Sequence, residues 1–215
     1  MQSEKIYKIT VNLIRVILIA TFILSIVYYS WFNLVMSCLA FILTFAPKLV
    51  EKKYKIEIPL DFEIVIILFI FASLFLGEIH NFYLRFWWWD TLLHTVSAFA
   101  FACVGFVILL LLFKTNKIVS QPVWIVIFSF CFAVTIGVLW EIFEFFMDQT
   151  FSFNMQKTGL LDTMLDLISN SIGALAASLA GYAYLKSGQH SLTARLINSL
   201  ITSNPKIKFK PPIKK

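Results

Sequence analysis

Charged residues are scarce in this sequence of 215 residues: Asp, Glu, Lys and Arg together make up 14% of it, against 60% hydrophobic residues. Soluble domains carry roughly a quarter charged residues. The scarcity of charge therefore excludes an ordinary soluble globular fold. The apolar residues instead gather in runs of roughly twenty, the length that crosses about 30 Å of hydrocarbon as a helix. We expect an all-α integral membrane protein, a helical bundle of about six transmembrane helices.

Cysteine is also rare, and Cys38, Cys103 and Cys131 each lie inside an apolar run. Their spacing excludes a four-cysteine zinc site and a disulfide framework, so we interpret them as small buried apolar residues. The motifs H-E-x-x-H and G-x-S-x-G, the Walker loop and the E-x-x-H pair of di-iron proteins are absent as well. Any catalysis is therefore expected to be metal-assisted or to use carboxylates as general acid and base.

Six apolar segments are predicted to cross the membrane. They run roughly Val11–Tyr29, Phe32–Val50, Phe62–Glu78, Thr91–Phe113, Pro122–Phe146 and Thr163–Leu185. A tight turn joins the first two segments, which predicts an antiparallel hairpin, and no A-x-A cleavage site follows the first segment. We expect residues 1–186 to form one six-helix transmembrane domain. Residues 187–215 are expected to form a basic cytoplasmic tail, partly disordered because it is rich in Ser, Asn, Pro and Lys.

The basic residues predict the orientation. With the N-terminus inside, the inner loops and both ends receive most lysines, whereas the outer loops receive only Arg85 and Lys157. The positive-inside rule favours this arrangement, with both termini cytoplasmic in a bacterial cytoplasmic (inner) membrane. Membrane lipids are the expected partners of the basic tail. No nucleic acid partner is expected, because aromatic or groove-reading elements are missing.

Acidic and histidine residues of the last four segments fall near the predicted outer ends of the helices. They are Glu78, Asp90, His94, Glu141, Glu144, Asp148, Asp162 and Asp166, accompanied by Asn170. Spacings of three, four and seven place those of one helix on a single face. A charge inside the membrane costs about 2.5–3.5 kcal/mol unless it is paired or hydrated, so we expect these faces to meet inside the bundle. The inner halves of the helices carry almost nothing comparable.

Carboxylates held together repel one another unless a cation or shared protons offset their charge. One hypothesis is a divalent metal, Zn, Mn or Mg, because carboxylates with an imidazole suit these ions. The expected ligands are Asp90, His94, Glu141, Glu144 and Asp166. The expected supporting residues are Glu78, Asp148, Asp162 and Asn170. A proton relay and a purely structural, hydrogen-bonded network are the alternatives.

Two of these residues have simpler interpretations of equal weight. His94 is four residues from Asp90, so it can be a packed histidine that is hydrogen-bonded to that carboxylate. Asp162 can be the N-terminal cap of the last helix. Glu141 and Glu144 favour a function more strongly, because a helix interior rarely holds two acids without a role for them.

The same residues resemble a known family. The stretches that carry the resemblance are Gly77-Glu78, Phe82-Tyr83, Trp88-Trp89-Asp90-Thr91-Leu92-Leu93-His94, Glu141-x-x-Glu144 and Gly159-x-x-Asp162-x-x-x-Asp166-x-x-x-Asn170-x-x-Gly173. They resemble the bacterial inner-membrane proteins typified by YjdF, which are multi-pass and functionally uncharacterised. The last helix is also loosely similar to VanZ-like proteins linked to glycopeptide resistance. The resemblance implies the topology and the site, and implies no activity.

Three functions remain open on the sequence. The first is a metal-assisted hydrolase or transferase acting on a lipid or lipid-linked substrate, with Glu141, Glu144, Asp166 and His94 as catalytic residues. The second is a structural or accessory membrane protein whose polar network fixes helix packing. The third is a proton- or cation-coupled transporter, disfavoured because the polar cluster lies to one side of the membrane midplane. The sequence does not define the oligomeric state.

Overall fold

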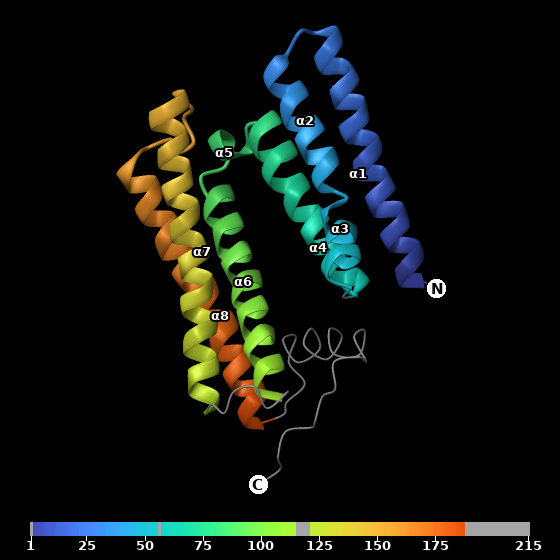
Figure 1. The fold of residues 1–215 in the computed structure, drawn as a ribbon. Helices are drawn as coiled ribbons and strands as arrows, with labels where there is room; N and C mark the ends of the chain where they lie inside the picture. Colours follow the sequence, from blue (N-terminus) through green and yellow to red (C-terminus); the bar gives the residue numbers. More distant parts are fainter. Residues whose placement is uncertain (1, 56, 115–120, 188–215) are drawn as a thin grey trace. The chain divides into compact units, whose positions relative to one another are not determined.

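The computed structural model describes residues 2–55, 57–114 and 121–187, which form helices and turns and contain no strand (Figure 1). Within these ranges six helical spans are long and apolar enough to cross a membrane. They are Glu4–Val27, Trp31–Tyr54, Phe62–Ile79, Trp89–Leu109, Pro122–Phe151 and Leu160–Lys186. The predicted all-α class and the six spans are confirmed. The predicted tail lies outside the described residues from position 188 onward.

The chain divides into two compact units, Met1–Trp89 and Asp90–Lys215. The helices of the first are α1 (Gln2–Val27), α2 (Trp31–Leu43), α3 (Ala46–Tyr54), α4 (Leu60–Ile70), the π-helix η1 (Phe71–Ile79) and the short α5 (Phe82–Arg85). The second holds α6 (Trp89–Lys114, which begins at the boundary), α7 (Pro122–Phe151) and α8 (Leu160–Ser187). The domain boundary expected at residue 186 stays a prediction.

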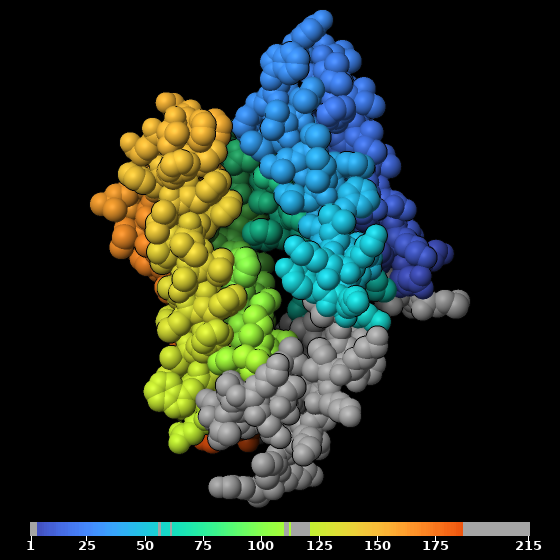
Figure 2. Space-filling view, in the orientation of Figure 1, coloured from blue at the N-terminus to red at the C-terminus, as the bar shows by residue number. Residues whose placement is uncertain are grey.

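Large apolar side chains cover the outside of the helices. Along α1, Ile9, Leu13, Val16 and Ile23 are all exposed, and the bulky side chains of the α1–α2 hairpin are visible in blue in Figure 2. A water-soluble protein rarely exposes contiguous apolar surface of this extent. The surface therefore fits lipid as the surrounding solvent, in agreement with the composition.

The second predicted segment is broken into two helices. The helix α2 ends at Leu43 and α3 begins at Ala46, with Pro47 in its first turn. Proline lacks the backbone N–H that would continue the hydrogen bonding of α2, so a break here is expected. Arg15 of α1 donates to the Thr44 hydroxyl (3.0 Å) and carbonyl (3.3 Å) at this break, and its guanidinium lies over the Phe45 ring.

The third segment changes from α-helix to π-helix at Phe71, which the periodicity of the sequence did not predict. Gly77 lies in the π-helix against the ring of Tyr83, where a Cβ atom would collide with the aromatic carbons. A π-helix is rare and frequently found at functional sites. In this unit the widened turns place Gly77 where the chain can fold back over it.

Small side chains let the helices of the second unit approach closely. The buried core of α6, α7 and α8 is built largely from Ala98, Ala102, Ala133, Ala174 and Ala177. Gly173 of α8 lies so close to the carbonyl of Thr95 in α6 that a Cβ atom would strike it. Membrane helices commonly associate through such small residues. This close packing brings the polar faces of the three helices together.

Candidate metal centre

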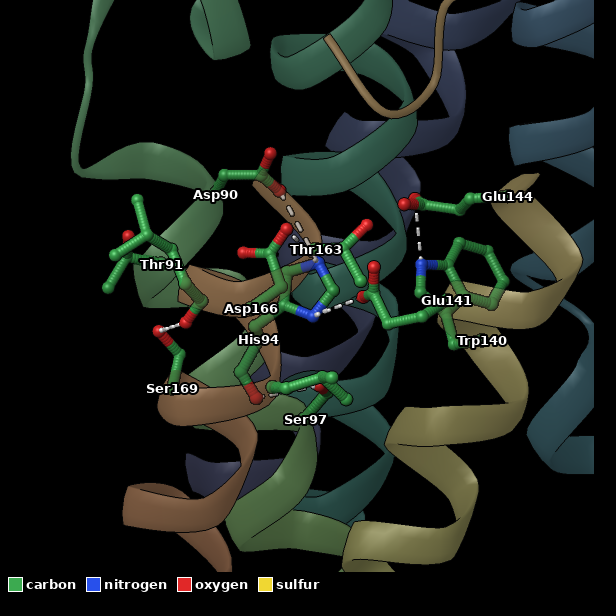
Figure 3. A network of polar contacts seen from close by, with 12 residues as sticks. Asp90, Thr91, His94, Ser97, Trp140, Glu141, Glu144, Thr163, Asp166 and Ser169 are labelled. Carbon is green, nitrogen blue, oxygen red and sulfur yellow. Dashed lines mark hydrogen bonds and ion pairs between the residues drawn. The ribbon is translucent and has the colours of Figure 1, made fainter. Parts of the chain in front are cut away.

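Polar side chains from three helices converge in the second unit (Figure 3). Asp90 and His94 lie in the first two turns of α6, Glu141 and Glu144 in the second half of α7, and Asp166 in the second turn of α8. All except Asp90 are buried, with Asp166 only 3% exposed and Glu141 only 4%. The helical spacing of the sequence thus places these residues on faces that meet.

Three of these residues direct ligand atoms at one point. His94 Nε2 lies 3.5 Å from Asp90 Oδ1 and 3.8 Å from Asp166 Oδ2. These separations exceed the usual 2.7–3.2 Å of a hydrogen bond. Ligand atoms bonded at about 2.0 Å to one tetrahedral ion lie roughly 3.3 Å apart. All three atoms lie within 4.8 Å of one another, so Asp90, His94 and Asp166 can hold a metal ion.

Glu141 faces the other nitrogen of the same imidazole. Its Oε1 lies 3.8 Å from His94 Nδ1, on the opposite side of the ring from Asp90 and Asp166. Histidine ligands usually donate their second N–H to a carboxylate or carbonyl, which fixes the tautomer that binds the metal. Glu141 is therefore placed to orient His94, whereas the sequence had suggested that Glu141 is itself a ligand.

Glu144 lies beside the three ligand residues but is occupied differently. Trp140 Nε1 donates to Glu144 Oε1 at 2.9 Å along the same face of α7 (Figure 3). Trp140 was not singled out by the sequence, although its spacing of four from Glu144 on one helix was a usable signal. The indole hydrogen bond holds the Glu144 carboxylate in place.

Lys157 forms an ion pair with Asp90 Oδ2, so the two oxygens of this carboxylate have different neighbours. The side chains of Lys157 and Asp90 are only 19% and 20% exposed. The sequence places Lys157 in an outer loop near the acids, but the contact with Asp90 bridges 67 residues and depends on the tertiary fold. The simpler interpretation of His94 stays open, because Lys157 contacts Oδ2 while Oδ1 lies 3.5 Å from the imidazole.

Asp148 has a different role from the one expected. Its Oδ1 accepts the Met155 amide at 2.8 Å and its Oδ2 accepts the Gln156 amide at 2.9 Å. The Gln156 side chain in turn donates to the hydroxyl of Thr163 at 2.7 Å. Asp148 therefore organises the loop between α7 and α8, and both its oxygens are used there.

The remaining predicted residues are placed as follows. Asp162 lies in the first turn of α8, two residues after the helix begins at Leu160, so it is not the capping residue. Asn170 is 2% exposed, and its side-chain amide packs where Gly137 of α7 leaves room. Glu78 lies on η1 in the first unit, and its membership of the site stays a prediction.

Several buried polar atoms of the second unit have no hydrogen-bond partner among the described residues. They are both carboxylate oxygens of Glu141, Oδ2 of Asp162, Oδ2 of Asp166, Nδ2 of Asn170 and the Ser178 hydroxyl. Buried polar groups are nearly always satisfied in folded proteins, because each unmet group costs free energy. Five of these six atoms belong to Glu141, Asp162, Asp166 and Asn170, four residues that the sequence had already singled out.

The first unit corrects one expectation. Polar groups were expected at one end of the helices only, yet Glu63 near the start of α4 is 0% exposed and pairs with Lys48 of α3 at 2.5 Å. Glu63 was not singled out by the sequence, although it lies at the start of the predicted segment Phe62–Glu78, directly after the polar stretch Glu51–Asp61. Its burial depends on the tertiary structure, in which α1 and α2 pack against α4.

Comparisons with known proteins agree with this architecture. The family described as "Predicted membrane protein (DUF2238)" matches residues 10–187, and the chain belongs to this family. An uncharacterised protein of Thermotoga maritima is 35% identical over 130 residues, which span 60% of this chain and 66%, just under two thirds, of that protein. No solved structure matches. Neither description names the YjdF-like or VanZ-like resemblance, and both stay hypotheses.

Proposed function

We propose that this member of the DUF2238 family of predicted membrane proteins binds a divalent metal ion and uses it in hydrolysis or group transfer on a lipid or lipid-linked substrate. The observation that carries the proposal is the triad of Asp90, His94 and Asp166. Its ligand atoms lie within 4.8 Å of one another, at separations of 3.5 and 3.8 Å from the imidazole nitrogen. Three protein ligands that leave a coordination position open are typical of catalytic zinc sites.

The chemistry of the donor set fits such an ion. Two carboxylates and one imidazole suit Zn, and also Mn, whereas Mg prefers oxygen ligands throughout. A bound ion of this kind supplies Lewis acidity and lowers the pKa of a bound water. It would also offset the repulsion among the carboxylates that surround His94.

The residues around the triad would have distinct tasks. Glu141 would orient the metal-binding tautomer of the imidazole by accepting its Nδ1–H, since its Oε1 lies 3.8 Å from Nδ1. Glu144, held by Trp140, presents a fixed carboxylate that can accept or return a proton as a general base or acid. Because the two glutamates lie one turn apart on α7, a single helix positions both tasks.

The position of the triad supports a substrate at the membrane surface. Asp90 lies in the first turn of α6 and Asp166 in the second turn of α8, each next to a loop rather than at mid-helix. With both chain ends in the cytoplasm of a bacterial inner membrane, as the distribution of lysines favours, these turns face the outer leaflet. Lipid headgroups lie at that level, which is why a lipid-linked substrate is proposed. A transporter would favour a site nearer the midplane.

A structural role is the second candidate, and it rests on a separate observation. The pairs Lys157–Asp90 and Trp140–Glu144 both use acids of the cluster in contacts within the protein. A network that only fixes helix packing would form such pairs. It does not account for the Glu141 carboxylate, neither oxygen of which accepts a hydrogen bond within normal distance, or for the long separations around His94.

Elemental analysis of the detergent-purified protein tests the proposal. We expect one equivalent of a divalent ion in the wild type and less than 0.1 equivalent, a loss of roughly 10-fold or more, in Asp166→Asn and His94→Ala. Glu144→Gln is the matched control, a buried acid of the same cluster outside the triad, and it should keep the ion.

Two outcomes would contradict the proposed metal site. A folded wild type that takes up no Zn or Mn, even after dialysis against either, would contradict the metal site. Equal occupancy in wild type and in both triad variants would place the ion elsewhere. In either case the structural role would become the better account, with Asp166→Asn expected to change stability alone.

A further inference from the structure

One carboxylate of the candidate centre faces two cationic positions. Asp90 directs Oδ1 toward the His94 imidazole at 3.5 Å, on the side where the triad can hold an ion, and Oδ2 toward the ammonium of Lys157. An ion bound by the triad and the Lys157 ammonium would therefore lie on neighbouring oxygens of the same group. Two positive charges would then border one small space.

The loop that carries Lys157 is held in place by hydrogen bonds. Asp148 accepts the backbone amides of Met155 and Gln156, and Gln156 is tied to Thr163 on α8. The loop leaves α7 at Ser152 and enters α8 after Gly159, both in the left-handed backbone region (φ 56° and 69°). These hydrogen bonds fix Gln156, the residue before Lys157. The conformation of the loop therefore places Lys157 next to Asp90.

Lys157 is also the one basic side chain at this end of the second unit among residues 121–187. The other lysine in that range, Lys186, lies in the last turn of α8, at the far end of a helix that begins next to Lys157. A lone ammonium among acids is sufficient to neutralise one of them. Its positive charge would attract an anion, as the proposed ion would.

We propose that the substrate carries a phosphate ester, and that its phosphoryl group binds between the ion of the triad and Lys157. The inference rests on the metal site of the proposed function. A phosphoryl group has several oxygens that can contact an ion and an ammonium at once, and such paired cations are the usual way proteins bind it. The acids around His94 would repel any anion that did not engage both cations, which favours phosphate over a singly charged carboxylate.

The position of Lys157 relative to the membrane indicates the source of the phosphate. The loop 152–159 joins two helices that are long and apolar enough to cross a membrane, so Lys157 lies near the level of the lipid phosphates. The phosphate ester is therefore assigned to a phospholipid headgroup rather than to a soluble metabolite.

The test measures binding, separately from turnover, with the detergent-solubilised full-length chain loaded with Zn. Dihexanoyl phosphatidic acid and inorganic phosphate are titrated calorimetrically into wild type, Lys157→Gln, Lys157→Arg and the control Lys186→Gln. We expect Lys157→Gln to keep the ion and to bind the lipid about 10-fold or more weakly, since one charged hydrogen bond is lost. Lys157→Arg should restore most of the affinity, and Lys186→Gln should match the wild type.

The outcomes separate this inference from the one on which it rests. If the wild type binds no metal, the proposed function fails. If metal binds and Lys157→Gln leaves lipid affinity unchanged, or loses the metal itself, the phosphate role of Lys157 is overturned. If inorganic phosphate binds as tightly as phosphatidic acid and depends equally on Lys157, the headgroup assignment is overturned and the source is free phosphate.

Discussion

Both units of the molecule bury carboxylates in apolar surroundings, but they balance the charge differently. In the first unit, Lys48 donates to Glu63 at 2.5 Å and to Glu51 at 3.0 Å, so an ammonium stands between the two acids. In the second unit, the acids around His94 outnumber the one nearby lysine, which forms an ion pair with Asp90. One ammonium thus serves two acids in the first unit, whereas in the second unit one ammonium serves a larger set of acids, and the larger excess of acids is better suited to bind a cation.

The two units nevertheless share a local hydrogen-bonding arrangement. In each, an acid near the end of a helix accepts a backbone amide seven residues later: Glu51 from Ile58 at 2.7 Å and Asp148 from Met155 at 2.8 Å. Each acid thereby folds the loop that leads to the next membrane-crossing helix. The comparison teaches that an acid in a membrane helix is not by itself evidence of a site, because two of the acids are explained by loop folding.

The largest effect should come from removing Lys48 from the cluster that it forms with Glu51 and Glu63 in the first unit. We expect Lys48→Met to lower the free energy of unfolding by about 3 kcal/mol, because the fully buried Glu63 loses its counter-charge. SDS-induced unfolding in detergent micelles, followed by circular dichroism, measures the change. The double variant Lys48→Met/Glu63→Leu should recover to within about 1 kcal/mol of the wild type. A double variant as unstable as the single one would show that the cluster has a role beyond charge compensation.

The next largest effect is expected from Glu141, in the acidic cluster around His94 of the second unit. We expect Glu141→Gln to weaken Zn binding roughly 10- to 100-fold, because a neutral amide orients and polarises His94 less well than a carboxylate. Competition with a chromophoric chelator measures the affinity. Stability should hold or rise slightly, since the substitution removes a buried carboxylate that accepts no hydrogen bond within normal distance. Glu144→Gln, one turn away, serves as the control, and equal weakening in both variants would argue against the orienting role of Glu141.

A smaller effect is expected from Asp148, which accepts backbone amides of the loop between α7 and α8. Asp148→Ala removes two amide hydrogen bonds to a carboxylate and should lower the free energy of unfolding by about 1.5 kcal/mol. Hydrogen exchange of the Met155 and Gln156 amides should speed up locally, while Zn affinity changes little. Glu51→Ala should destabilise more, because Glu51 also pairs with Lys48. A large loss of Zn from Asp148→Ala would instead make Asp148 part of the centre, as the sequence suggested.

The smallest effect concerns a pair that neither unit buries. Lys8 donates to Glu4 at 2.8 Å, and their side chains are 67% and 55% exposed. Exposed ion pairs contribute little, because water solvates both charges and salt screens them. We expect Glu4→Gln to leave the unfolding midpoint unchanged within error in the same SDS titration. A clear shift would mean that exposure is not what separates the two kinds of ion pair.

Several elements were predictable from the sequence because they depend on local chemistry. Long apolar runs require helices in lipid, since backbone groups must be satisfied within each segment, and this determined the six spans. Spacings of three and four determined that Asp90 and His94, and likewise Glu141 and Glu144, share a helix face. The break at Pro47 and the π-helix at Phe71–Ile79 were not predicted, because apolar periodicity does not register a change of hydrogen bonding within a run.

The sequence by itself therefore determined the class of the protein and the candidate residues, since hydrophobicity and helical periodicity act over a few turns. Only the tertiary structure decided which candidates meet. It joined Asp90 and His94 to Asp166 across more than 70 residues, sent Asp148 to a loop, and placed Lys157 on Asp90. The physical reason is that small residues such as Gly173 set how closely two helices approach, and that distance, unlike helix type, depends on both partners at once.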